Sequence, residues 1–182
     1  MRRALLDIGP MDDLTIATNV SALEVVGPRM ASDVAGVLAD CDVDPGRLWL
    51  EITESAWLTP DETAIAAVTA LEAVGVRIAI DDFGTGHSAL THLQRLPVDA
   101  LKVDRSFVAG IPGTPRDTVI VRAIAAMAHA LELEFVAEGV ETHEQRAGLL
   151  ELGVDLAQGW LFAPALPADQ LADLVARPPR FD

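Results

Sequence analysis

The chain has 182 residues, of which 51% are hydrophobic, enough for one globular domain with a substantial core. Its formal net charge of −15 disfavours DNA or RNA as partners, because nucleic-acid binding depends on Lys and Arg contacts to phosphates. The single cysteine excludes an internal disulfide and fits a reducing compartment, so we expect a cytoplasmic protein. No apolar run approaches the ~20 residues of a membrane helix, so we expect no membrane segment.

Strand-like and helix-like segments alternate along the whole chain. The predicted strands are residues 15–20, 48–52, 78–82, 100–104, 134–138 and 156–160. The predicted helices are residues 1–8, 28–38, 59–74, 90–95, 116–131, 142–153 and 168–176. Such alternation implies parallel strands joined by right-handed crossovers. We therefore predict an α/β fold, with no linker and no second domain within residues 1–182.

A polar residue lies inside or at the end of every predicted strand: Asn19, Glu51, Asp81, Lys102, Glu138 and Gln158. An open, doubly wound sheet is the alternative fold, and it gathers its ligand groups at one crevice. A barrel instead collects a side chain from every strand at one mouth. The pattern therefore favours a TIM-like βα barrel.

Two adjacent carboxylates, Asp81 and Asp82, end the third predicted strand and precede a glycine-rich loop. Because successive strand residues point to opposite faces, we expect one to face the barrel axis and the other to turn out at the rim. Carboxylates this close repel each other unless a cation lies between them. The alternative is that one caps the following helix and the other is solvated.

The candidate metal ligands are Asn19, Glu51, Asp81 and Asp82. Their carboxylate and amide oxygens are hard ligands, which suit Mg²⁺ or Mn²⁺ better than Zn²⁺. Two cations bridged by a carboxylate are typical of phosphodiester hydrolysis. In such a mouth Lys102 can orient water or an anionic oxygen, and Glu138 can accept a proton. Schiff-base chemistry at Lys102 is the rival hypothesis. The surrounding carboxylates speak against it, because they should raise the pKa of the amine.

These residues lie in motifs that resemble a known family. The chain is similar, from Asn19 to Pro167, to the EAL domain, a metal-dependent phosphodiesterase that linearises cyclic di-GMP. Six motifs in order carry the resemblance: Asn19-Val20-Ser21, Glu51-Ile52-Thr53-Glu54-Ser55, Asp81-Asp82-Phe83-Gly84-Thr85-Gly86, Leu101-Lys102-Val103-Asp104-Arg105-Ser106-Phe107, Val136-Ala137-Glu138-Gly139-Val140-Glu141-Thr142 and Gln158-Gly159-Trp160-Leu161-Phe162.

The resemblance implies hydrolysis of cyclic di-GMP to linear pGpG, with two bound cations, Mg²⁺ or Mn²⁺. The implied cation ligands are Asn19, Glu51 and Asp81 for the first, and Asp81 and Asp82 for the second. Lys102 would hold the attacking water, and Glu138 would act as base or metal partner. Substrate-binding or supporting roles fall to Asp104, Glu54, Glu141 and Gln158, with Glu54 steadying the loop after Asp82. The implied fold is a modified βα barrel whose first strand is antiparallel.

The chain also departs from the family pattern. No Glu-Ala-Leu precedes Asn19, and roughly six of the eight barrel strands are found, so we expect a barrel that is incomplete at its N-terminus. His87 replaces a Tyr, and Pro164-Ala165 replaces a basic residue followed by proline. The alternative function is therefore a catalytically inactive domain that binds cyclic di-GMP or a protein. Open sheet edges also predict association into homodimers.

Overall fold

The computed structural model describes residues 1–9, 11, 14–54, 62–85, 93, 95–113 and 115–177. Within them, six parallel strands form one sheet in sequential order. The strands are β1 (Ile16–Asn19), β2 (Leu48–Thr53), β3 (Arg77–Phe83), β4 (Ala100–Val103), β5 (Glu134–Ala137) and β6 (Leu156–Ala157). The helices are α1 (Arg2–Ile8), α2 (Ala22–Val25), α3 (Met30–Cys41), α4 (Glu62–Val74), α6 (Arg105–Val108), α7 (Pro115–Ala130), α8 (His143–Glu151) and α9 (Ala168–Ala176).

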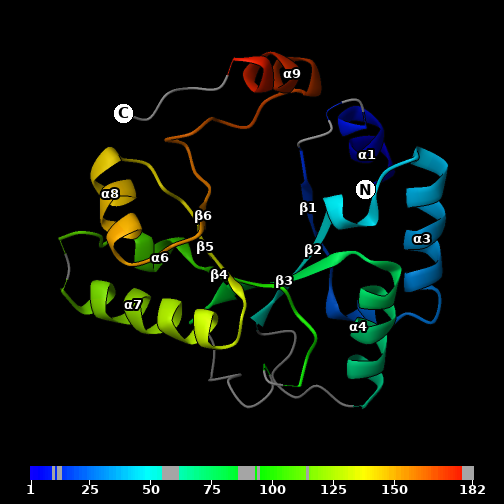
Figure 1. Ribbon diagram of the computed structural model, residues 1–182, viewed down its shortest axis with the longest axis horizontal. Coiled ribbons are helices and arrows are strands. Elements are labelled where there is room, and N and C mark those ends of the chain that lie inside the picture. Colours follow the sequence, from blue (N-terminus) through cyan, green and yellow to red (C-terminus); the bar gives the residue numbers. More distant parts are fainter. Residues whose placement is uncertain are drawn as a thin grey trace.

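The sheet curls into a half-barrel, with its helices on the outside (Figure 1). Helices α3 and α4 lie on the β1–β3 side, and α7 and α8 lie on the β4–β6 side. Within the described residues β1 and β6 do not pair with each other, and α1 and α9 lie beside the open side. The predicted α/β barrel class is confirmed, and the doubly wound alternative is wrong.

The two faces of the sheet pack against different surroundings. Outward-facing residues such as Leu50, Ile78 and Leu101 are fully buried against the helices. Burying one such side chain contributes roughly 1.5–3 kcal/mol. The inward face has a separate and much smaller apolar cluster, formed by four residues: Trp49, Ala79, Ala100 and Val136. The main core therefore lies between the sheet and the helices, and the inward face carries this small apolar cluster together with polar groups.

Short helices are the main difference from the sequence expectation, which missed α2, α6 and a 3₁₀ turn at Pro45–Arg47. Ser21 caps α2 in a capping box with Glu24, and Asp104 caps α6 by accepting from the Ser106 N–H at 3.0 Å. The predicted capping box of Thr142 and Gln145 begins α8. Of the helix predicted at 90–95 only residues 93 and 95 are described, and Thr59, the predicted cap of the 59–74 helix, lies outside the described residues.

One side chain joins the residues that precede β1 to the start of β2. Arg47 donates to the carbonyl oxygens of Ile8 at 2.8 Å, Met11 at 2.6 Å and Leu14 at 2.8 Å. These bonds add to the parallel pairing of β1 with β2. No helix in the described part of the chain is long and apolar enough to cross a membrane.

Candidate functional site

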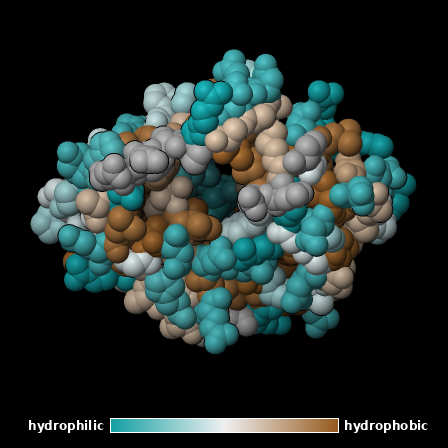
Figure 2. Space-filling model, turned by 45° about the horizontal axis from the view of Figure 1, so that its top comes forward, coloured by the Kyte–Doolittle hydropathy of each residue, from teal (hydrophilic) through white to brown (hydrophobic). Residues whose placement is uncertain are grey.

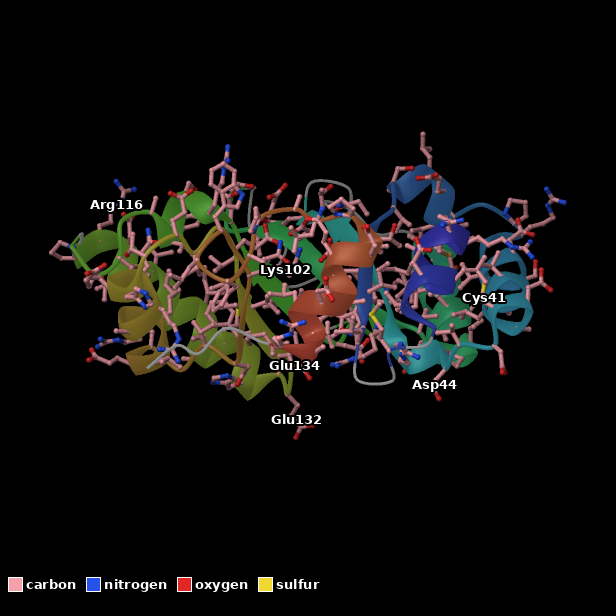
Figure 3. The ribbon with its side chains drawn as sticks, turned by 90° about the horizontal axis from the view of Figure 1, so that it is seen from above. Cys41, Asp44, Lys102, Arg116, Glu132 and Glu134 are labelled. Atoms are coloured by element: carbon pink, nitrogen blue, oxygen red, sulfur yellow. The ribbon has the colours of Figure 1, made fainter. Side chains whose placement is uncertain are left out.

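The polar residues at the strand ends meet at one rim. Asn19 on β1 lies opposite Glu51 on β2, and Asp81 on β3 lies opposite Thr53. Lys102 on β4 lies opposite Val136, two residues before Glu138. This rim is formed by the carboxyl ends of the strands, where βα-barrel enzymes have their active sites. Lys102 lies near the middle of the molecule, between the two groups of helices (Figure 3).

The ammonium group of Lys102 is the centre of this rim and is only 3% exposed. It lies 2.5 Å from Glu51 Oε1 and 3.2 Å from Asp81 Oδ1, and it also pairs with Glu138 Oε1. Burial acts to lower the pKa of Lys102, but the hydrogen bonds that its ammonium donates to Glu138 and Glu51 outweigh burial and raise the pKa above the ordinary value. The amine is therefore protonated, which excludes the Schiff-base hypothesis because that chemistry needs a neutral amine.

The rim carries more negative than positive charge. Three carboxylates surround one ammonium, which leaves a net charge of −2 when all four groups are ionised. Burial, with the neighbouring charges of Asp81 and Glu51, raises the pKa of Glu138 although the Lys102 ammonium acts to lower it. Burial, and then the neighbouring charge of Asp81, likewise raise the pKa of Asp82. Both shifts indicate carboxylates that lack sufficient positive charge nearby.

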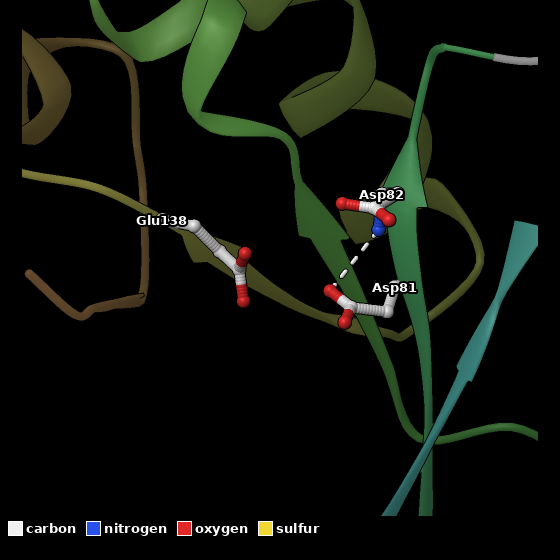
Figure 4. A group of neighbouring side chains, drawn as sticks. All are labelled: Asp81, Asp82 and Glu138. Atoms are coloured by element: carbon white, nitrogen blue, oxygen red, sulfur yellow. Dashed lines mark hydrogen bonds between the residues drawn. The ribbon is translucent and has the colours of Figure 1, made fainter. Parts of the chain in front are cut away.

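The sequence predicted that the side chains of Asp81 and Asp82 point to opposite faces of the sheet. In the structure they do not. Carboxylate oxygens of Asp81, Asp82 and Glu138 all lie within 4.8 Å of one another and face a common space (Figure 4). The alternation fails because the β3–β4 register shifts between Ile80 and Phe83 and because Asp82 is left-handed, with φ of 55°. The Asp82 N–H also donates to Asp81 Oδ1 at 3.0 Å, which fixes the first carboxylate.

Glu54 lies beneath the loop that follows the Asp pair. Its side chain is 2% exposed, and Oε2 accepts from the Gly84 N–H at 2.9 Å. Gly84 has φ of 98°, a conformation that glycine adopts without strain. The contact fits the expected role of Glu54 at the start of this loop. His87 lies outside the described residues.

The other predicted site residues are arranged less closely. Asn19 is exposed, and Gln158 donates from Nε2 to Glu138 Oε1 at 3.3 Å. Asp104 caps α6 and is close enough to Asp82 to raise the pKa of that carboxyl. Glu141 is exposed, and its backbone N–H donates to Gln145 Oε1 at 2.7 Å. In the described part of the chain we find no contact from the Glu141 carboxylate to the rim.

A cavity of about 360 Å³ adjoins Glu138, and the sequence analysis did not predict it. Its lining includes Arg105, Gly139, Gln158 and Trp160, and the indole of Trp160 is 78% exposed. Glycine at 139 is required by φ of 69° and by the close approach of the Arg105 side chain. The sequence did hold a signal that could have identified Arg105 and Trp160 as residues near the site, namely their position. Arg105 follows Asp104, and Trp160 follows Gln158-Gly159.

Comparison with known proteins identifies the family. The family model of the EAL domain matches residues 1–165. The chain belongs to the EAL domain family. It is 41% identical over 187 residues to the cyclic di-GMP phosphodiesterase NbdA of Pseudomonas aeruginosa, covering 100% of this chain and 24% of NbdA.

Solved EAL domain structures share the fold. The EAL domain of Mycobacterium smegmatis DcpA is 39% identical, with a TM-score of 0.92, over 97% of this chain and 82% of that one. BlrP1 of Klebsiella pneumoniae, in a complex with manganese and cyclic di-GMP, is 30% identical, with a TM-score of 0.83, over 90% of this chain and 42% of that one. The chain spans about a quarter or less of the length of the first curated relatives that it matches.

Proposed function

We propose that this EAL domain is a cation-dependent phosphodiesterase that hydrolyses cyclic di-GMP to linear pGpG. The observation that carries the proposal is the group formed by Asp81, Asp82 and Glu138, whose oxygens lie within 4.8 Å of one another beside the buried Lys102. The relative NbdA is named as a phosphodiesterase of this nucleotide, and BlrP1 holds it together with manganese.

The carboxylate group fits a divalent cation. Its donors are all oxygen, which suits Mg²⁺ or Mn²⁺, and its charge exceeds what Lys102 neutralises. Asp81, Asp82 and Glu138 would hold one cation, with Glu51 and Asn19 available for a second next to Asp81. When bound, such cations would lower the pKa of water and neutralise charge on the phosphate.

The chain's own residues would then position the reactants. The Lys102 ammonium would donate a hydrogen bond to the attacking water, and Glu138, whose pKa is raised, would accept the proton that this water loses. The water oxygen forms a bond to phosphorus as the bond from phosphorus to the ribose 3′ oxygen breaks, and that oxygen takes up a proton from solvent and leaves as the 3′ hydroxyl. The product is a linear dinucleotide with a 5′ phosphate.

The cavity beside Glu138 would receive the rest of the nucleotide. The exposed indole of Trp160 offers a flat face on which a guanine can stack. Arg105 offers a guanidinium that can pair with a phosphate. Asp104 and Gln158, which flank this cavity and the rim, are the proposed supporting groups.

The proposal is tested by incubating the chain with cyclic di-GMP and Mn²⁺ or Mg²⁺ and separating the products by chromatography. We expect linear pGpG from the wild type, and a loss of roughly 100-fold or more in the Asp81→Asn variant. Glu72→Gln, which removes an exposed carboxylate from α4, is the control and should keep full activity. Binding of cyclic di-GMP without any product would contradict the proposal and favour a nucleotide receptor.

A further inference from the structure

One large side chain lies directly below the polar rim. Trp49, Ala79, Ala100 and Val136 each precede a rim residue on the same strand by two positions, so they line the same inward face one layer lower. Three of the four have small or medium side chains. Trp49, directly below Glu51 on β2, is therefore the largest side chain of this inward cluster.

Trp49 is itself supported by its register partner on the neighbouring strand. The guanidinium carbon of Arg77 lies 4.2 Å from the centroid of the Trp49 ring. Arg77 is in turn held by Glu134 at 3.0 Å and faces Asp99 at 3.8 Å. The cation–π contact and the ion pairs fix the plane of the indole.

The indole contributes through its ring and not through its polar atom. Trp49 is 8% exposed, and its Nε1 has no hydrogen-bond partner within the described residues. An unpaired buried N–H is unfavourable, so the volume of the ring and its face towards Arg77 are what favour this residue here. Phenylalanine would keep the aromatic face and remove the unpaired N–H.

Trp49 and the rim also border the same space. A cavity of about 340 Å³ inside the half-barrel is lined by Trp49 together with Glu51, Lys102 and Gln158. Lys102 and Glu51 are buried, at 3% and 7% exposed, and this space lies on one side of their side chains. The indole is the rigid surface that limits where they can move.

We propose that Trp49, supported by Arg77, is a positioning residue that holds the Glu51–Lys102 ion pair in the geometry needed at the rim. The role in cation binding rests on the proposed function, but the coupling between Trp49 and Lys102 does not. Trp49 touches no reacting atom and acts through its two neighbours.

The first test is a double-mutant cycle without metal, on the full chain in EDTA. The thermal midpoints of Trp49→Phe, Trp49→Ala, Lys102→Met and the two double variants are compared with the wild type. We expect the shifts to be non-additive, because each side chain holds the other in place. Leu50→Ala is the matched control, since Leu50 is fully buried on the same strand but faces the outer helices. Its shift should add to that of Lys102→Met.

The second test is calorimetric titration with Mn²⁺. We expect Trp49→Ala to weaken Mn²⁺ binding about tenfold, as loss of an outer-shell support does, while Trp49→Phe retains most of it. Leu50→Ala should lower the thermal midpoint without changing the affinity of the folded protein. Equal Mn²⁺ affinity in Trp49→Ala and Leu50→Ala would overturn the inference.

The two tests separate the inference from the proposed function. Additive shifts for Trp49 and Lys102 would overturn the positioning role whatever the metal result. If the shifts in thermal midpoint are non-additive and the wild type binds no Mn²⁺, the positioning role is supported and the proposed function is overturned. The Trp49→Phe variant keeps the cycle decisive if Trp49→Ala does not fold.

Discussion

The backbone of Asp82 is the feature that turns two neighbouring carboxylates towards the same space. Its φ of 55° is uncommon for a residue with a side chain, and Asp and Asn tolerate it better than Ala. The structure accepts this conformation at the end of β3, next to the shifted register with β4. Position 82 therefore has two separable properties, a conformation and a charge.

We expect Asp82→Asn to leave the unfolding free energy nearly unchanged, because asparagine keeps the left-handed conformation. Asp82→Ala should cost about 1 kcal/mol, because alanine is strained there. Chemical denaturation measures both, and Mn²⁺ titration should show weakened binding in each. Equal unfolding free energies for the two variants would contradict the argument from backbone strain.

The raised pKa values of Glu138 and Asp82 predict how cation binding depends on pH. Protonated carboxyl groups do not bind cations, so protons compete at a higher pH than they would at ordinary carboxylates. We expect Mn²⁺ affinity to fall as the pH decreases, starting above the ordinary carboxyl pKa of about 4. Titrations over a pH series measure this, with Glu138→Gln as the variant in which the dependence should weaken. An affinity that falls only near about pH 4 would refute it.

At the scale of elements, most of the fold could be predicted because its signals are strong. Strands of a parallel sheet are buried on both faces, so β2 and β3 are visible as nearly continuous apolar runs that end in a carboxylate. The four-residue helices α2 and α6 were missed because one turn has no hydrophobic period. β6 is shorter than predicted and ends before Gln158, where the chain turns towards Val140.

That the polar side chains at the strand ends gather at one rim was predictable, and their geometry there was less so. The rim residues could be identified because barrel topology brings strand ends together whatever the details. The side to which Asp82 turns depends on a register shift, and the contacts of Arg105 and Trp160 depend on loops, so neither follows from periodicity. The support of Trp49 by Arg77 needs the register of β2 with β3, in which these two residues are partners.

The connection between α1 and β1 depends on one guanidinium group. Arg47→Lys removes most of its hydrogen bonds to the carbonyls of Ile8, Met11 and Leu14, because an ammonium cannot reach all three. We expect the free energy of unfolding to fall by roughly 2 kcal/mol. Denaturant titration measures this free energy. Arg29→Lys, at an exposed position, is the control and should leave the free energy of unfolding unchanged. An unchanged free energy of unfolding in Arg47→Lys would show that these hydrogen bonds contribute little to stability.

At the scale of the whole molecule, we infer that the open side of the half-barrel favours association with another chain. The surface is hollowed near the centre of the face in Figure 2, with hydrophobic side chains beside the hollow. On the β6 edge Leu156 is 47% exposed, and in the described residues no strand pairs with this edge. Unpaired edges with apolar side chains favour association.

We expect the isolated chain to form dimers through this edge, and Leu156→Lys to shift it towards the monomer, because a charge on an edge strand opposes pairing. Sedimentation velocity over a concentration series measures the shift. Leu23→Lys, on α2 at a residue that is 85% exposed, is the control and should leave the distribution unchanged. A wild type that sediments as a monomer at every concentration would refute this prediction.

The sequential strand order also bears on how the protein is made. Each strand pairs only with its neighbours along the chain, so a nascent polypeptide can add βα units outward from the ribosome, each onto an edge that is already formed. The rim, in contrast, draws on β1 at one end and on the residues after β6 at the other. Within the described residues the candidate site is therefore completed only after most of the strand pairs can form.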